Sequence, residues 1–168
     1  QQVDVAFLLD TTGSMGAEIA AMAGEFSAIV DELSTSIEDA EYGYATYDDY
    51  PVSPYGDHGT DQAFNLRQQI TDSESAVQAA MDATDRHSGS DGPESTIEAL
   101  YQGASGDGYD MNCDSAFDTV TDVLPFLASA SDPFGGTGGE AWDADSTGGG
   151  ANGGYGFRDD TLPVFMYA

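Results

Sequence analysis

Apolar residues occur along the chain in short runs and in spaced stripes, and the two patterns predict different elements. Residues 3–9 (V-D-V-A-F-L-L) form a short apolar run that is typical of a strand buried on both faces of a parallel sheet. Between Met15 and Ile37, apolar residues recur at spacings of three and four, which predicts a long amphipathic helix packed on that sheet. The chain therefore opens as strand, polar turn and helix, the beginning of an α/β fold.

Later segments repeat these patterns. Strands are predicted over 41–47, over 63–66 as a short edge strand, and over 161–168 as another buried strand. Helices are predicted over 76–81 behind a Thr71/Glu74 capping box, from Pro93 to about Gln102, and over 116–130. This alternation predicts an α/β fold with a Rossmann-like, mainly parallel sheet and helices on both faces.

The length of 168 residues suits a single domain. Within it, residues 131–157 form a Gly- and Asp-rich stretch in which Trp142 is the large apolar anchor. Structureless loops of this length are uncommon in compact domains and are usually functional or disordered. We therefore expect one domain over 1–168 with a long loop inside it.

The charge of the chain excludes several partners. It carries 31 Asp and Glu residues against three arginines and no lysine, for a net charge of −28. Such a chain does not neutralise phosphates, so nucleic acids and anionic membrane surfaces are excluded as partners. A hydrophobic content of 40% nevertheless predicts a globular domain rather than an acidic tail. Two explanations of the acidity stay open: a halophilic or marine extracellular setting, and a surface tuned for solubility.

Cys113 is the sole cysteine, so no disulfide forms within these residues. In a secreted protein it either pairs outside this segment or remains a buried thiol, and the sequence leaves both open. No apolar run reaches the roughly 18 residues needed to span a bilayer, and no basic-then-apolar leader is visible.

The strongest chemical signal is D-T-T-G-S at 10–14, directly after the first strand. Ligands of open α/β sheets bind outside the carboxyl ends of the strands, where this turn is expected. Asp10, Thr12 and Ser14 offer one carboxylate and two hydroxyls from a single turn. Such an all-oxygen set suits a hard divalent cation: Mg²⁺ first, with Ca²⁺ or Mn²⁺ as alternatives.

At these residues the sequence resembles the von Willebrand factor A (vWA) domain family. D-T-T-G-S-M matches the D-x-[ST]-x-S pattern of that family's metal-ion-dependent adhesion site (MIDAS), and a long amphipathic helix follows it. The resemblance implies that Asp10, Thr12 and Ser14 bind a divalent cation, and that an acidic residue of a ligand fills its open position. It also implies the vWA fold.

A second segment, G-S-D-G-P-E at 89–94, resembles the G-G-x-D-x-P-E loop of one branch of the family. This resemblance implies that Asp91 is a fourth ligand, either directly or through a water. The family's last metal aspartate follows its fourth strand, at the place where this sequence ends with Ala168. We therefore expect the domain to be incomplete at its C-terminus, with that ligand on a continuation or on another chain.

Other candidates are weaker. Asp48 and Asp49 follow the second predicted strand and are expected in a solvated turn; the alternatives are the second coordination shell of the metal and the lining of an adjacent cation site. Asp143 and Asp145 resemble a secondary Ca²⁺ loop in composition, but the bidentate Glu of an EF-hand is absent. Asp57, His58 and Asp61 offer metal-competent atoms, but they lie in a loop with no partner pattern around it, and His87 is expected only to border the site.

These observations predict a secreted or cell-surface adhesion module that binds an acidic group of a protein or glycan through its cation. The alternative is a structural subunit of an extracellular filament, pilus tip or matrix that self-associates through metal-mediated contacts. An enzyme is not predicted, because Ser14 has no histidine base in a recognisable motif. The absent lysine and the acidity also disfavour an intracellular chelatase or ATPase partner module.

Overall fold

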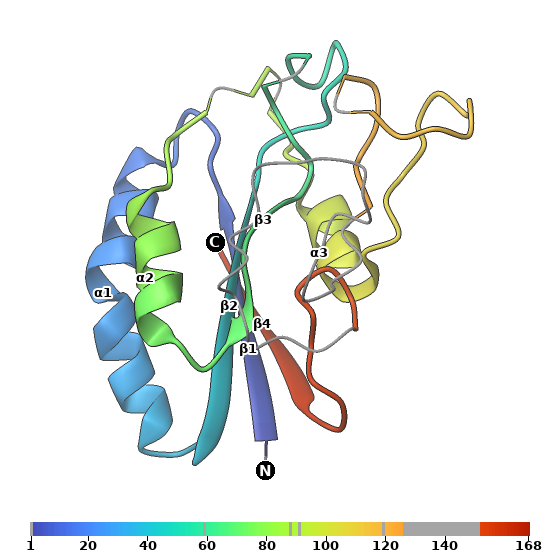
Figure 1. The fold of residues 1–168 in the computed structure, drawn as a ribbon. Coiled ribbons are helices and arrows are strands. Elements are labelled where there is room, and N and C mark those ends of the chain that lie inside the picture. The colour runs from blue at the N-terminus through green and yellow to red at the C-terminus, as the bar shows by residue number, and fades with distance from the viewer. Residues whose placement is uncertain (1, 59, 88, 91, 119, 126–151) are drawn as a thin grey trace.

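The computed structural model describes residues 2–58, 60–87, 89–90, 92–118, 120–125 and 152–168. This part of the chain forms four strands and three helices, and Figure 1 shows their arrangement. In chain order they are β1 (Gln2–Asp10), α1 (Gly16–Ser34), β2 (Asp39–Tyr47), β3 (Asn65–Thr71), α2 (Glu74–Asp82), α3 (Thr96–Ser105) and β4 (Leu162–Tyr167). The predicted α/β class is confirmed.

The described strands form one mixed sheet in the order β3-β2-β1-β4. β1 lies at its centre and pairs in parallel with both β2 and β4. β3 runs antiparallel to β2, with register shifts between Tyr42 and Ala45. Because β1 and β2 are parallel and in register through Asp10 and Tyr47, the loops that follow them leave the same edge of the sheet.

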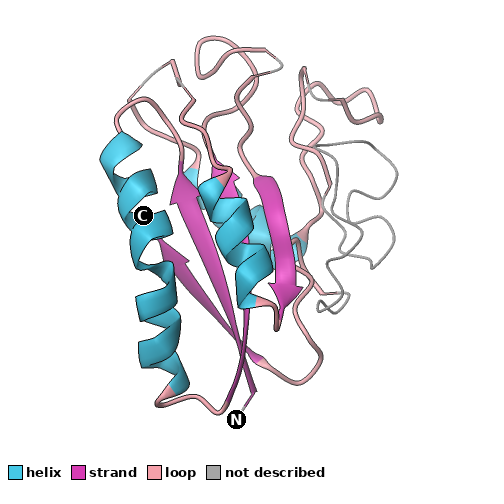
Figure 2. Ribbon diagram, turned by 60° about the vertical axis from the view of Figure 1, so that its left-hand side comes forward, coloured by secondary structure: helices cyan, strands magenta, loops and turns pink. Residues whose placement is uncertain are grey.

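Helices cover both faces of this sheet (Figure 2). On one face, α1 and α2 pack on alternate β1 residues, and Phe7 of β1 meets Phe26 of α1 edge-to-face at 5.5 Å between ring centroids. On the other face, Ala99 of α3 packs with Leu8 and Tyr155. β1 is therefore buried on both faces, as its continuous apolar run predicts.

Several predicted boundaries shift. The edge strand predicted over 63–66 is instead β3, Asn65–Thr71. Its later part contains Gln68 and Gln69, which are buried although their side chains are polar, so the sequence pattern does not indicate a strand there. The Thr71/Glu74 capping box is wrong, because Ser73 is the N-cap of α2 and makes no side-chain cap hydrogen bond. Thr71 belongs to β3, and its hydroxyl accepts the Ser73 N–H at 3.1 Å.

Two helix ends also differ from the expectation. α1 ends at Ser34 rather than Ile37, although Ile37 still packs on the core beneath it. α3 begins at Thr96 rather than near Pro93. Ser95 donates from its N–H and its hydroxyl to the Asp48 carbonyl oxygen, at 3.3 and 3.0 Å, which fixes it ahead of the helix.

The helix predicted over 116–130 is wrong for its described residues, which form turns and a bridge. Carboxylates capture the backbone N–H groups that a helix would use: Asp118 Oδ1 accepts from Val120 and Thr121, both at 2.8 Å. Asp122 is buried and accepts the Met111 N–H at 3.0 Å. In the same region Cys113 is exposed, so the buried-thiol alternative is also wrong.

The end of the long predicted loop belongs to the core. Tyr155 and Phe157 are buried, and the Tyr155 hydroxyl donates to the Phe7 carbonyl oxygen at 2.7 Å. Gly43 makes room for this packing, because a Cβ there would lie 2.9 Å from both Tyr155 and Ile70. Trp142 lies outside the described residues, whereas these two aromatics anchor the segment to the sheet.

At the amino end of β1, Arg158 joins three carboxylates. Its Nε donates to the buried Asp4 at 2.7 Å, and its Nη1 donates to Asp39 and Glu41, both at 2.8 Å. These hydrogen bonds raise the pKa of Arg158 and lower that of Asp39, while burial raises the pKa of Glu41. The group ties the start of β4 to β1 and β2, at the end of the sheet opposite to Asp10.

Candidate functional site

Asp10 is the last residue of β1 and shapes the turn that leads into α1. Its Oδ1 accepts the Thr12 backbone N–H at 2.8 Å and the Thr12 hydroxyl at 2.7 Å. Asp10 is 8% exposed and Thr12 is 2% exposed, so both side chains are buried at the start of the turn. The structure therefore brings these two predicted ligands together. Neither Asp10 nor Ser14 is the N-cap of α1, a position that Met15 occupies without a side-chain hydrogen bond.

Ser14 lies exposed in the same turn. The segment that resembles the family's second loop reaches this turn as well: Gly89 has a φ of +65°, and a Cβ on it would lie 3.2 Å from Thr12 Cγ2. Asp91 lies outside the described residues, as do Asp143 and Asp145. The N–H of Asp10 donates to the Ala168 carbonyl oxygen at 2.8 Å, so the chain after β4 also lies beside Asp10.

Thr11 links this turn to the end of β2. Its backbone N–H donates to the Tyr47 carbonyl oxygen at 2.9 Å, and its hydroxyl donates to Asp48 Oδ1. Asp48 and Asp49 are each 1% exposed, so the expectation of a solvated turn is wrong. Both residues directly follow β2, which pairs in parallel with β1. Asp48 is also contacted by Ser95, just before α3, whose hydroxyl donates to its carbonyl oxygen.

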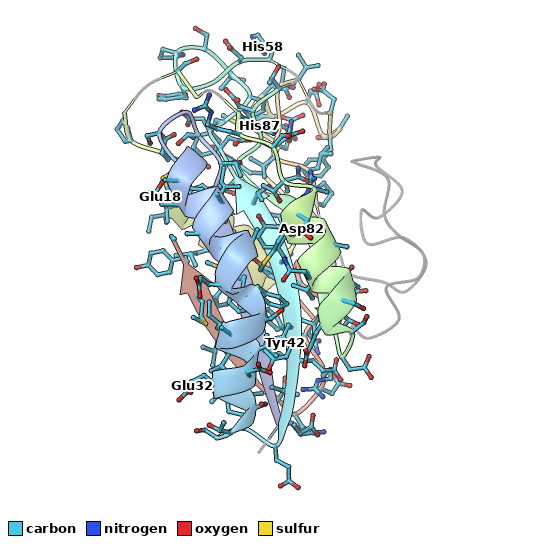
Figure 3. The ribbon with its side chains drawn as sticks, turned by 90° about the vertical axis from the view of Figure 1, so that its left-hand side faces the viewer. Glu18, Glu32, Tyr42, His58, Asp82 and His87 are labelled. Atoms are coloured by element: carbon cyan, nitrogen blue, oxygen red, sulfur yellow. The ribbon has the colours of Figure 1, made fainter. Side chains whose placement is uncertain are left out.

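His87 joins Asp48 from the loop after α2, and Figure 3 shows it at this end of the sheet. Its Nδ1 lies 2.8 Å from Asp48 Oδ2, and its backbone N–H donates to the Thr11 carbonyl oxygen at 2.7 Å. The hydrogen bond with Asp48 raises the pKa of the imidazole. His87 therefore borders the β1–α1 turn, as expected, and in addition contacts Asp48.

Asp61 completes a cluster with Asp48 and His87. Each of the three residues offers one ligand atom, and these atoms lie within 4.8 Å of one another. Asp61 is 0% exposed; its Oδ2 accepts the Asp57 N–H at 2.8 Å, and its Oδ1 has no hydrogen-bond partner. In the sequence, Asp61 belongs to a turn-rich segment with no partner pattern, 13 positions after Asp48 and 26 before His87, so its metal-competent carboxylate was not assigned to a site. These residues have the donor types and spacing of a metal site.

Buried negative charge dominates this edge of the sheet. Burying a carboxylate costs several kcal/mol unless it gains charge-compensating partners. The edge buries four carboxylates that are each less than a tenth exposed, namely Asp10, Asp48, Asp49 and Asp61. His87, 26% exposed at its side chain, contacts Asp48 directly and compensates part of this charge when it is protonated. A divalent cation would compensate this charge.

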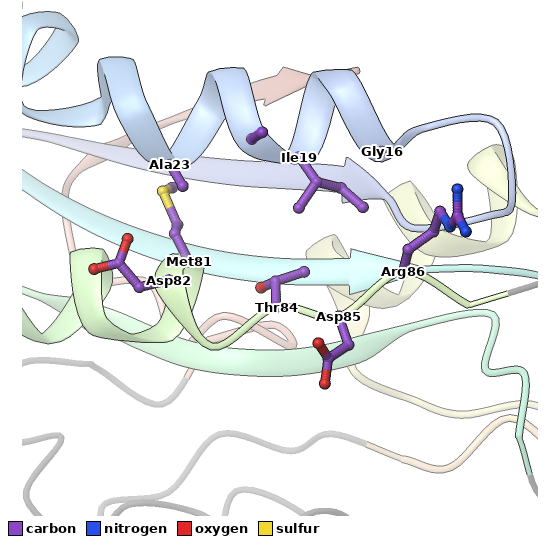
Figure 4. Close-up of a pocket in the computed structure, with 9 residues that line it drawn as sticks. Gly16, Ile19, Ala23, Met81, Asp82, Thr84, Asp85 and Arg86 are labelled. Atoms are coloured by element: carbon purple, nitrogen blue, oxygen red, sulfur yellow. The ribbon is translucent and has the colours of Figure 1, made fainter.

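Two neighbouring features complete the surroundings. His58 is exposed, and its Nδ1 lies 2.9 Å from the Val120 carbonyl oxygen, outside the cluster. A hollow of about 350 Å³ lies between α1 and the end of α2, with Arg86 and Gly16 at one end of it (Figure 4). Its other lining residues include Ile19, Met81 and Asp82. None of the candidate ligands lines this hollow.

A comparison of the sequence with models of known protein families finds no matching family, and a comparison with curated proteins finds no significant match. Within the described residues, no helix is both long and apolar enough to cross a membrane.

Proposed function

We propose that the chain is a divalent-cation-dependent binding module of the vWA type. In this proposal Asp10, Thr12 and Ser14 hold a hard cation, Mg²⁺ first, and Asp91 completes the set directly or through a water. An acidic group of a protein or glycan would fill the position that these ligands leave open. The module would act outside the cell or on its surface, by binding rather than by catalysis.

The observation that carries the proposal is the placement of Asp10 and Thr12 among four buried carboxylates at the carboxyl edge of β1 and β2. Ligands of open α/β sheets bind at this edge. Without a cation, an acidic ligand would meet an excess of negative charge here, from four buried carboxylates beside the single imidazole of His87, on a chain whose net charge is −28. A metal reverses the sign of the local field, so binding of an acidic ligand requires it.

Two further observations support the vWA fold. The strand order β3-β2-β1-β4, with β1 central and parallel to two neighbours, suits a doubly wound sheet. Gly89, from the segment that resembles the family's second loop, packs against Thr12. A glycine suits this position, because few L side chains adopt its φ of +65° and a Cβ would press on Thr12. In the proposal, Asp91, two positions further along the chain, is the ligand that this loop supplies.

Calorimetric titration of Mg²⁺ into the metal-free chain tests the proposal. We expect saturable binding in the wild type and its loss in Asp10→Asn, with Asp31→Asn on the exposed face of α1 as the matched control. Carboxylate recognition is then tested with an immobilised glutamate-rich peptide, which the protein should retain with Mg²⁺ and release on chelation. A folded wild type that takes up no divalent cation would contradict the proposal.

The exposed edge strand β4 favours a second candidate function, that of a structural subunit of an extracellular filament, pilus tip or matrix. β4 is an edge strand among the described residues and exposes Leu162, Val164 and Tyr167. Exposed apolar edge strands pair readily with another chain. Light scattering with and without Mg²⁺ separates the candidates: metal-dependent assembly in the absence of other proteins supports the subunit, and a monomer under both conditions supports the binding module.

A further inference from the structure

We infer that Asp48, Asp61 and His87 form a second metal site, distinct from the Asp10 site, that takes a divalent transition-metal ion such as Zn²⁺. The inference concerns three residues from two loops: Asp48 and Asp61 lie near opposite ends of the loop between β2 and β3, and His87 follows α2. It does not depend on the proposed function, because it requires none of the Asp10, Thr12 or Ser14 side chains.

The first argument is the distance between the ligand atoms. Ligand atoms about 2.0–2.1 Å from a tetrahedral Zn²⁺ lie about 3.4 Å from one another. The Asp48 Oδ2 to His87 Nδ1 distance of 2.8 Å is shorter than this, and 4.8 Å is the upper bound for all three pairs. Side-chain movements of about 1 Å would therefore complete the coordination. The ion would replace the hydrogen bond between Asp48 and His87.

The second argument is the buried Asp61 carboxylate. Asp61 is inaccessible to solvent, and its Oδ1 has no hydrogen-bond partner. Buried polar atoms are nearly always satisfied, because an unsatisfied one keeps its full desolvation cost. The backbone is built closely around this carboxylate: a Cβ on Gly56 would lie 2.9 Å from Asp61 Oδ2. A cation held jointly with Asp48 and His87 would give this carboxylate its missing partner.

The third argument is the chemistry of the donors. One imidazole nitrogen and two carboxylate oxygens suit Zn²⁺ and its neighbours, whereas Mg²⁺ and Ca²⁺ prefer oxygen ligands alone. Mg²⁺ also retains several waters, for which a cluster with two wholly buried members leaves little room. Three protein ligands leave a fourth position for a water or another group. The two proposed sites therefore differ in the metal that they prefer.

The cluster lies directly beside the turn that contains Asp10 and Thr12, and this position indicates what a bound ion would do. Thr11 donates its hydroxyl to Asp48 and accepts the His87 backbone N–H through its carbonyl oxygen at 2.7 Å. Both bonds hold the turn in which Asp10 and Thr12 lie. An ion that fixes Asp48 and His87 would thereby fix the turn, and it would act as a structural metal beneath the proposed cation-binding turn.

The test is calorimetric titration of Zn²⁺ into the metal-free chain with Mg²⁺ in large excess. The excess Mg²⁺ occupies the acidic surface and the oxygen-only site. We expect one equivalent of Zn²⁺ to bind, with an affinity at least about tenfold lower in His87→Gln and in Asp61→Asn. His58→Gln and Asp31→Asn are the matched controls on exposed residues and should bind Zn²⁺ like the wild type.

Asp10→Asn separates the two sites, because it should abolish Mg²⁺ binding and leave Zn²⁺ binding intact. If circular dichroism shows that one of the two cluster variants, His87→Gln or Asp61→Asn, does not fold, the other variant provides the test. In the wild type, ¹⁵N spectra should show that Zn²⁺ shifts the His87 ring nitrogens and not those of His58. Absence of Zn²⁺ binding in the wild type would overturn the inference. Zn²⁺ binding that His58→Gln removes and His87→Gln spares would overturn it equally.

Discussion

The backbone N–H of His87 donates a hydrogen bond to the carbonyl oxygen of Thr11 at 2.7 Å, across 76 positions of sequence. This bond joins the loop after α2 to the turn between β1 and α1. It brings His87 to Asp48, whose side chain also accepts from the Thr11 hydroxyl. Thr11 is thus the residue through which the proposed transition-metal site supports the proposed cation-binding turn.

Replacing Thr11 by valine tests this link. Thr11→Val keeps the shape of the side chain and removes the hydroxyl that donates to the buried Asp48. We expect a loss of about 1–3 kcal/mol in the free energy of unfolding, because a buried carboxylate loses a donor, and weaker Mg²⁺ binding. Urea denaturation and calorimetry measure the two effects. Thr35→Val, whose hydroxyl is exposed at the end of α1, should change neither to a comparable extent.

Arg158 and the carboxylates that it binds at the amino end of β1 predict that the stability of the fold depends strongly on this arginine. Arg158→Leu leaves Asp4, which is wholly buried, without its guanidinium partner. Breaking such a buried pair costs about 3–5 kcal/mol, and urea denaturation should show it. The matched control is the exposed Arg86, where Arg86→Leu should stay within about 0.5 kcal/mol of the wild type. Equal effects in the two variants would contradict this account of Arg158.

The hydrogen bonds of Arg158 also predict a lowered pKa for Asp39. Hydrogen bonds from Arg158 and Gln2 lower the pKa of Asp39 below its usual 3.8. A lowered folded-state pKa means that the contribution of Asp39 to stability is present above pH 3.8 and is lost as the pH falls through the folded value. The contribution is small, because the side chain is 46% exposed and solvent screens it. Carboxyl ¹³C titration should show the lowered pKa in the wild type and a higher one in Arg158→Gln.

Two glycines form a matched pair for the packing of the core. A Cβ on Gly43 would lie 2.9 Å from Ile70 and from the buried Tyr155, so Gly43→Ala should destabilise the fold by about 1–3 kcal/mol. Gly24 lies on the exposed side of α1 with nothing within 4 Å of the same position, so Gly24→Ala should stabilise it by about 0.5–1 kcal/mol. Thermal denaturation should therefore move in opposite directions for the two variants.

Local pattern was sufficient to predict the elements that frame the site. The apolar run of β1, the stripe of α1 and the aromatic content of β2 each arise from burial against neighbours that lie close in the fold. Local pattern was insufficient where polar groups decide the backbone. Asp118 captures two N–H groups and prevents the helix predicted over 116–130. The buried glutamines of β3 give it a polar sequence, so the full length of this strand, which pairs with β2, was not predicted.

The candidate site divides in the same way. Asp10 and Thr12 interact within one turn, and their spacing in the sequence was enough to predict that they converge. Asp61 reaches Asp48 only because the loop between β2 and β3 turns back on itself, and His87 joins them from the loop after α2. No spacing rule joins residues across these two loops, so the cluster needed the tertiary structure. The continuation of the domain beyond β4 remains a prediction, as does the role of Asp91.

The most direct test of the central claim is where a divalent cation binds. Mn²⁺ added at a small fraction of an equivalent should broaden the amide signals of residues 10–14 first in two-dimensional ¹⁵N spectra, with excess Zn²⁺ present to fill the histidine cluster. Excess Mg²⁺ should restore those signals, and Asp10→Asn should abolish the local broadening. Broadening spread evenly over the acidic surface, or unchanged in Asp10→Asn, would contradict the claim that this turn holds the cation.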